Sequence, residues 1–310
     1  MANFLTMQNH TKGIFYASVT AFFWGFLAIA LKIATREVDP VTIVWVRFFV
    51  AFLILSTWLT IKKPSSFHIF RKPPLLLIFA ALGLSWNYMG YMLGIHYTTP
   101  SNAQLFIQSG PLLLAIAGFV IFKEKLERKQ IIGFVVAFVG FAFFYRDQLS
   151  AFFETRSSYQ SGILFTISGA VAWAAYAILQ KKLVLKHPVD SLNLVLFGLP
   201  AIIYLPFINL APVFQLHWTW WLLLLFLGLN TFVAYTCMAN ALKYTEANKV
   251  SIIIVLNPMI TFTAMGILTK MNVSWVAHER FSVMTIIGAA IVFAGAVLVV
   301  SRSKKRKKSI

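Results

Sequence analysis

Acidic residues are scarce in this chain, where nine Asp and Glu stand against 27 Lys and Arg among 310 residues. Charged residues of both signs make up 12% of the sequence, about half of the ~25% that soluble domains carry. None of the nine acids falls in the middle of a long apolar run, where proton and sodium relays usually need one. A water-soluble protein is therefore excluded, and coupling through a carboxylate inside the membrane is disfavoured.

Residues that bind metals or act as nucleophiles are equally sparse. Cys237 is the one cysteine, which excludes an intramolecular disulfide and a thiolate metal cage. The six histidines are scattered, and the sequence has no phosphate-binding glycine loop and no H-E-x-x-H motif. We expect no catalytic residue, no metal and no cofactor. A membrane enzyme acting on lipid, or a receptor or scaffold, stays as a rival class that substrate flux would distinguish from a carrier.

Apolar residues, in contrast, make up 59% of the sequence. A helix that crosses the ~30 Å hydrocarbon core of a bilayer needs roughly 20 apolar residues. The sequence predicts an all-α integral membrane protein with ten transmembrane helices. We expect them at residues 13–34, 40–61, 75–96, 98–122, 130–146, 162–184, 191–210, 218–241, 246–269 and 280–301.

Basic residues concentrate in alternate loops between these helices. A further basic segment, "RSKKRKK", spans residues 302–308. The positive-inside rule then predicts that both termini are cytoplasmic. This distribution favours membrane topology and attraction to lipid headgroups over nucleic-acid binding. The expected partners are the lipid bilayer and a small-molecule substrate, with no nucleic acid and with the chain as a monomer or homodimer.

The chain also repeats itself. Residues 13–34 align without gaps on 162–183 with seven identities. Further matches follow downstream. The repeat pairs are Trp24 with Trp173, Tyr88 with Tyr235, Tyr97-Thr98 with Tyr244-Thr245, Pro111 with Pro258, and Glu124, Gly133 and Gly140 with Glu279, Gly288 and Gly295. Residues 1–150 and 151–310 would each hold five helices, an odd number, so the second half enters the membrane from the opposite side. Such inverted repeats are typical of transporters that bind substrate at the midplane.

Three segments resemble a known family: "DPVTIVWVRF", "TTPSNAQLFIQSGPLLLAIAGFVIFKEKLERKQIIGFVVAFVGF" and "EANKVSIIIVLNPMITF…ERFSVMTIIGAAIVFAG". They are similar to the EamA-type repeats of the drug/metabolite transporter (DMT) superfamily, over nearly the whole chain. The resemblance implies a metabolite transporter of the bacterial cytoplasmic (inner) membrane. It leaves the substrate open among amino acids, S-adenosylmethionine, nucleotide-type compounds and other metabolites.

Two cations lie inside predicted helices. Arg47 is about seven residues into helix 40–61, about 10 Å below the outer surface. It is interpreted first as an anchor that fixes an interhelical contact, and second as a group that meets a carboxylate-bearing substrate. Lys249, near the start of helix 246–269, either snorkels to the cytoplasmic surface or turns inward toward such a substrate.

Polar and aromatic residues recur on helices that would line the gap between the halves. Trp24 and Trp173 lie near mid-span, away from the interfacial belt that tryptophans prefer. A water-filled cavity at the midplane explains these residues, and interhelical packing is the alternative. Besides the two cations, the predicted substrate site consists of Trp24, Trp173, Tyr88, Tyr235, Asn87, Tyr91, Gln104 and Gln108.

Pro111 and Pro258 occupy matching positions of helices 98–122 and 246–269. Proline breaks the helical hydrogen-bond ladder, so we expect paired kinks that serve as hinges for alternating access. An aromatic cavity with few charges favours an amino acid or a related compound as the substrate, with an S-adenosylmethionine or nucleotide-type metabolite as the alternative.

Overall fold

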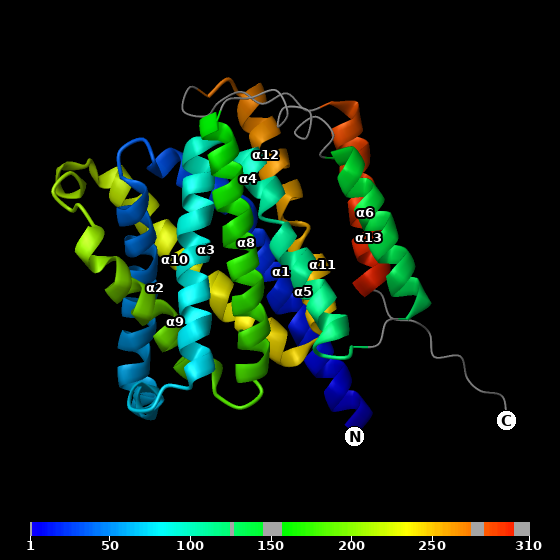
Figure 1. The fold of residues 1–310 in the computed structure, drawn as a ribbon, viewed down its shortest axis with the longest axis horizontal. Helices are drawn as coiled ribbons and strands as arrows, with labels where there is room; N and C mark the ends of the chain where they lie inside the picture. Colours follow the sequence, from blue (N-terminus) through cyan, green and yellow to red (C-terminus); the bar gives the residue numbers. More distant parts are fainter. Residues whose placement is uncertain (1, 125–126, 145–156, 274–281, 301–310) are drawn as a thin grey trace.

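The structure is a computed structural model that describes residues 2–124, 127–144, 157–273 and 282–300. All regular secondary structure in these ranges is helical (Figure 1). The α-helices are α1 (Ala2–Ala34), α2 (Pro40–Lys62), α3 (Leu75–Tyr97), α4 (Pro100–Phe106), α5 (Ser109–Val120), α6 (Arg128–Phe144), α8 (Ser157–Leu183), α9 (Val189–Tyr204), α10 (Trp218–Tyr244), α11 (Ala247–Ile254), α12 (Asn257–Lys270) and α13 (Val283–Val300), with short 3₁₀ helices η1 (Pro64–Phe70), η2 (Leu205–Phe207) and η3 (Val213–Gln215).

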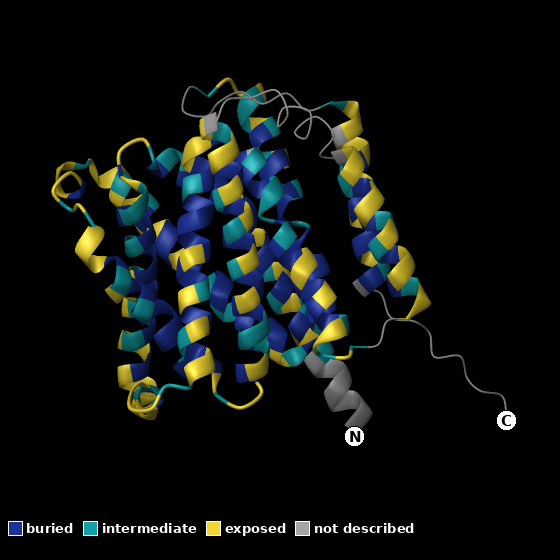
Figure 2. Ribbon diagram, in the orientation of Figure 1, coloured by how far each residue is buried: buried dark blue, intermediate teal, exposed yellow. Residues whose placement is uncertain are grey.

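Eight helical stretches within the described ranges are long and apolar enough to cross a membrane, and Ile286–Val299 is a shorter apolar helix. The eight match eight of the ten predicted spans. The other two, 130–146 and 280–301, correspond to α6 and α13, which have 17 and 18 residues. At 1.5 Å per residue these helices are about 26 Å long, slightly shorter than a bilayer core. Exposed residues recur along the helices of the bundle (Figure 2). Many of them are large and apolar, as expected of a surface that faces lipid.

Short sequence signals fix where helices begin. Asp39 precedes α2, and its carboxylate accepts a hydrogen bond from the backbone N–H of Thr42 at 2.9 Å. Thr99 precedes α4 and caps it through the backbone N–H of Asn102 at 3.3 Å. In both cases proline follows at the first helical position, where its missing N–H costs no hydrogen bond.

Two predicted helices are broken rather than kinked. The expected helix 98–122 consists of α4 and α5, and the expected helix 246–269 consists of α11 and α12. Pro111 and Pro258 each lie in the first turn of the second piece. Proline clashes with the carbonyl four residues earlier, which belongs to Ile107 and Ile254 respectively, so the ladder is interrupted just before each second piece begins.

The helices form one bundle in which α6 and α13 stand together at an edge (Figure 1). The contacts between the two sequence halves include those of α1 with α10, α3 with α8, α2 with α9 and with α10, α5 with α11, and α6 with α13. α1 begins and α13 ends at the same end of the bundle (Figure 1). α2, α5 and α8 end there too (Figure 1), in or next to Lys62, Lys123 and Lys181. We call this end the basic end. The matched Glu279 and the basic tail at 302–308 lie outside the described residues.

The repeated glycines pack α6 directly against α13. A Cβ atom on Gly133 would come within 2.7 Å of the carbonyl oxygen of Gly295, and one on Gly140 within 2.6 Å of the backbone nitrogen of Val292. This contact joins a helix of the first half to a helix of the second.

Candidate functional site

A cavity lies between the two sequence halves, where the two broken helices meet the long helices. Its lining consists of Trp24, Leu27, Arg47, Asn87, Tyr88, Tyr91, Gln104, Ile107, Gln108, Pro111, Trp173, Tyr235, Ile254 and Asn257. Nine of the ten residues predicted to bind substrate line it. The exception is Lys249. Of the two predicted hinge residues, Pro111 lines the cavity and Pro258 lies next to Asn257.

Aromatic rings from both halves form one side of the cavity. The ring centroids of Trp24 and Trp173 are 5.9 Å apart at an interplanar angle of 74°. Tyr235 lies 5.3 Å from Trp24 and 5.5 Å from Tyr88. These separations fall within the 4.5–7 Å or so of favourable aromatic pairs. The cavity therefore offers a large apolar contact surface in the middle of the bundle.

Arg47 is the cation that lines the cavity, and the residue is only 2% exposed. Its Nε donates a hydrogen bond to the hydroxyl of Thr231 on α10 at 3.2 Å. Its guanidinium carbon lies 4.1 Å from the centroid of the Tyr88 ring. Among the described residues the ion pairs are Lys181–Glu124 and Lys249–Glu246, so no described carboxylate neutralises Arg47. The hydrogen bond to Thr231 is an interhelical contact of the kind expected of an anchor. Arg47 also lines the cavity.

A chain of polar side chains crosses from the first half to the second. The hydroxyl of Tyr91 donates to Oε1 of Gln104. Nε2 of Gln104 and Nε2 of Gln108 both donate to Oδ1 of Asn257, each at 2.7 Å. The amides therefore line the cavity and also bridge helices, which combines the two alternatives that the sequence left open. Oε1 of Gln108 is buried and has no hydrogen-bond partner among the described residues.

Sequence reasoning missed four lining residues, of which Leu27, Ile107 and Ile254 are apolar and Asn257 is polar. Asn257 begins α12 directly before Pro258, and its repeat mate is Gly110. A Cβ atom at Gly110 would lie 3.0 Å from the Trp173 ring, so the first half has no room for a side chain there. The available signal was the amide of an Asn-Pro pair inside an apolar run, at a position where the two repeats differ.

The cavity is narrow in this conformation. The space open to the centres of water molecules is about 50 Å³. Because one water needs about 10–15 Å³ of such space, the cavity has room for a few waters. A metabolite that needs more space than a few waters requires the walls to move apart.

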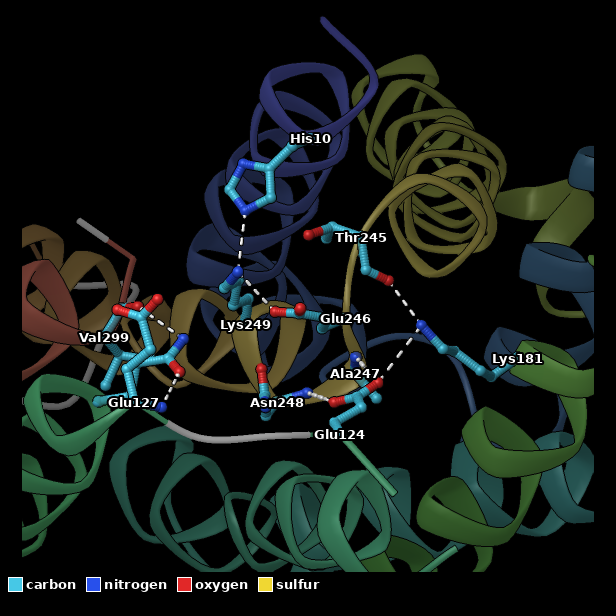
Figure 3. Close-up of polar contacts among 11 residues, drawn as sticks. His10, Glu124, Glu127, Lys181, Thr245, Glu246, Ala247, Asn248, Lys249 and Val299 are labelled. Atoms are coloured by element: carbon cyan, nitrogen blue, oxygen red, sulfur yellow. Dashed lines mark hydrogen bonds and ion pairs between the residues drawn. The ribbon is translucent and has the colours of Figure 1, made fainter. Parts of the chain in front are cut away.

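Lys249 lies at the basic end rather than in the cavity. Its Nζ is 2.5 Å from Oε2 of Glu246 and 3.1 Å from Nε2 of His10 (Figure 3). This position matches the snorkelling interpretation. In this structure Lys249 does not turn inward toward the cavity, which was the alternative. Arg47 is thus the cation available to a ligand in the cavity.

Comparisons with known proteins agree with this architecture. The sequence matches the EamA-like transporter family over residues 11–146 and 160–301. An "Uncharacterized inner membrane transporter YhbE" of Escherichia coli K12 is 32% identical over 293 residues, which cover 93% of this chain and 91% of that one. An "Uncharacterized transporter" of Haemophilus influenzae is 31% identical over 293 residues, covering 94% and 95%. A crystal structure with 18% identity has a TM-score of 0.71 over 94% of this chain and 97% of that one, and so has the same fold.

Proposed function

Because this chain belongs to the EamA-like transporter family of the DMT superfamily and is a multi-pass membrane transporter, we propose that it carries an amino acid or a related carboxylate-bearing metabolite by alternating access. The proposed architecture is ten transmembrane helices in two inverted five-helix repeats. The proposed location is the bacterial inner membrane, with the basic end and both termini in the cytoplasm.

We infer the substrate class from the buried charge of the Arg47 guanidinium. A buried cation is costly unless an opposite charge or hydrogen bonds compensate it. Thr231 satisfies one N–H group and the Tyr88 ring supplies a cation–π contact, but no described carboxylate is paired with the guanidinium. A substrate carboxylate would supply that charge through two parallel hydrogen bonds.

The remaining walls suit the other parts of an amino acid. Trp24, Trp173 and Tyr235 present ring faces and edges to an apolar or aromatic side chain. The unpartnered Oε1 of Gln108 is an acceptor, which an ammonium group would satisfy. Donors, acceptors and apolar surface therefore meet in one cavity, as in other small-molecule sites.

Two observations support the inverted repeats. α1 packs on α10 and α3 packs on α8. Because α1 and α8 are equivalent in the repeat, as are α3 and α10, a two-fold axis relates these two contacts to each other. The repeat mates Trp24 and Trp173, and likewise Tyr88 and Tyr235, contact each other. Residues related by a two-fold axis touch only near that axis. The cavity thus occupies the position about which two halves would rock in alternating access.

Counterflow in proteoliposomes tests the proposal. Vesicles holding the purified protein are loaded in turn with unlabelled amino acids, nucleosides or S-adenosylmethionine, and uptake of the labelled compound is followed. We expect exchange with amino acids, lost in Trp24→Ala and Trp173→Ala proteins that retain the wild-type gel-filtration profile. Exchange confined to nucleosides or S-adenosylmethionine would refute the amino-acid assignment, and absence of exchange with every compound would refute the carrier function for this panel.

A further inference from the structure

A carboxylate at the basic end ties the two halves of the chain together. Glu124 follows α5 in the first half, and the three partners of its carboxylate all belong to the second half. Its Oε1 and Oε2 accept hydrogen bonds from the backbone N–H groups of Ala247 at 2.7 Å and Asn248 at 3.1 Å. Nζ of Lys181 lies 3.6 Å from Oε1 (Figure 3). We call Glu124, Lys181 and the first turn of α11 the latch.

Local backbone structure aims Glu124 at α11. Lys123 has a positive φ of 53°, which turns the chain sharply at the end of α5. The backbone N–H of Glu124 then bonds to the carbonyl of Gly118 at 2.9 Å. A Cβ atom on Gly118 would come within 2.8 Å of Oε2 of Glu124, so the glycine leaves the space that the carboxylate occupies. The helix dipole of α11 adds to the attraction, since its first amides carry partial positive charge.

Lys181 connects the latch to a fourth helix, α10. Its Nζ also donates a hydrogen bond to the carbonyl oxygen of Thr245, the C-terminal cap of α10, at 2.6 Å (Figure 3). α5, α8, α10 and α11 are thereby held together at one point. The side chains of Lys181 and Glu124 are only 11% and 8% exposed, so the pair lies largely out of water.

Between the latch and the cavity, α8 carries polar groups that no described residue satisfies. Trp173 lines the cavity and Lys181 belongs to the latch, about 12 Å further along the helix. Tyr176 and Gln180 lie between them on the face that carries Trp173. The hydroxyl of Tyr176 and both polar atoms of the Gln180 amide are buried without a hydrogen-bond partner in the part of the chain that the structure describes. Such groups are costly in a permanently dry interior and are satisfied if this face meets water in another conformation.

From these observations we propose that the latch is the gate on the basic end of the cavity, and that its opening exposes the Tyr176–Gln180 face of α8 as the path of the substrate. The inference rests on the proposed alternating access. Opening requires Glu124 to leave the first turn of α11, which separates α5 of one half from α11 of the other. Closing restores the contacts seen here.

Thiol labelling tests the gate without any substrate. The background protein carries Cys237→Ala, which removes the one cysteine, and Gln180→Cys as the reporter. A membrane-impermeant methanethiosulfonate reagent is applied to inside-out vesicles, and the labelling rate is compared after adding Glu124→Gln or Lys181→Met. We expect about a tenfold faster rate in each, because a charge-assisted contact that favours the closed state is lost.

The chain offers a matched control for each change. Glu127 and Lys182 are the neighbouring exposed residues of the same charge, and Glu127→Gln and Lys182→Met should leave the labelling rate unchanged. If Glu124→Gln fails to fold, Lys181→Met with its control decides the matter. An unchanged rate in the latch variants, an equal rise in the controls, or a rise only in right-side-out vesicles would overturn the gate. The labelling assay uses no substrate, so its outcome is independent of the counterflow assay. A negative counterflow result with wild-type protein would count against the proposed function, whereas an unchanged labelling rate would count against the gate.

Discussion

Lys32 and Lys181 are repeat mates and make equivalent contacts at opposite ends of the bundle. Nζ of Lys32 donates a hydrogen bond to the carbonyl oxygen of Thr98 at 3.0 Å, and Nζ of Lys181 donates one to the carbonyl oxygen of Thr245 at 2.6 Å. Thr98 and Thr245 are themselves repeat mates that cap α3 and α10. Each lysine thus caps the C-terminal end of a helix, where the helix dipole favours a cation. This equivalence supports the proposed inverted repeats.

Lys32→Met should destabilise the protein. The lysine also donates to the carbonyl oxygen of Ile95 at 2.9 Å, so the substitution leaves two carbonyls without their charged donor. We expect a loss of about 1.5–3 kcal/mol per charged hydrogen bond at most, measured as a lower midpoint of thermal unfolding in detergent. Lys62→Met removes an exposed lysine from the last turn of α2 and should shift the midpoint much less. Equal shifts in the two variants would contradict the capping role.

Pro111→Ala and Pro258→Ala should slow transport. Alanine restores the N–H group that proline lacks and removes its clash, so a continuous helix becomes more favourable across each break. We expect a lower maximal exchange rate with little change in KM. Pro200 lies inside α9 and does not line the cavity, which makes Pro200→Ala the matched control. Rates per folded molecule that stay at the wild-type value in both hinge variants would remove the hinge role.

Gly133→Leu should separate α6 from α13. The new side chain would collide with the backbone of Gly295 and the side chain of Val299. Overpacking of a close contact costs typically about 1–3 kcal/mol, so we expect a lower thermal midpoint. Ala142→Leu places the same side chain on the exposed face of α6 and should be neutral. A Gly133→Leu protein as stable as the Ala142→Leu protein would show that this packing does not contribute to stability.

Much of the fold and of the cavity could be predicted because the responsible signals are local or repeated. Apolar length predicts the spans, and the internal repeat singles out Trp24, Trp173, Tyr88 and Tyr235, which the structure brings together in one cavity. That these residues bind substrate stays a prediction.

The features that were missed depend on tertiary contacts. Proline predicts an interruption but not whether the helix kinks or breaks, because neighbouring groups decide how the freed carbonyls are satisfied. Asn257 matters because Gln104 and Gln108 reach it from the other half. The repeat identified Glu124, but only the packing of α5 against α11 brings its carboxylate to the amides of Ala247 and Asn248.

The pairing of Arg47 with a substrate carboxylate is the central claim, and competition in the counterflow assay tests it most directly. Uptake of a labelled amino acid is competed with the unlabelled amino acid and with the amine that lacks its carboxylate. We expect the amino acid to compete at least tenfold better with wild-type protein, since a charged hydrogen bond is worth about 1.5–3 kcal/mol, and this preference to disappear in Arg47→Gln. Equal competition by the amine with wild-type protein would contradict the account.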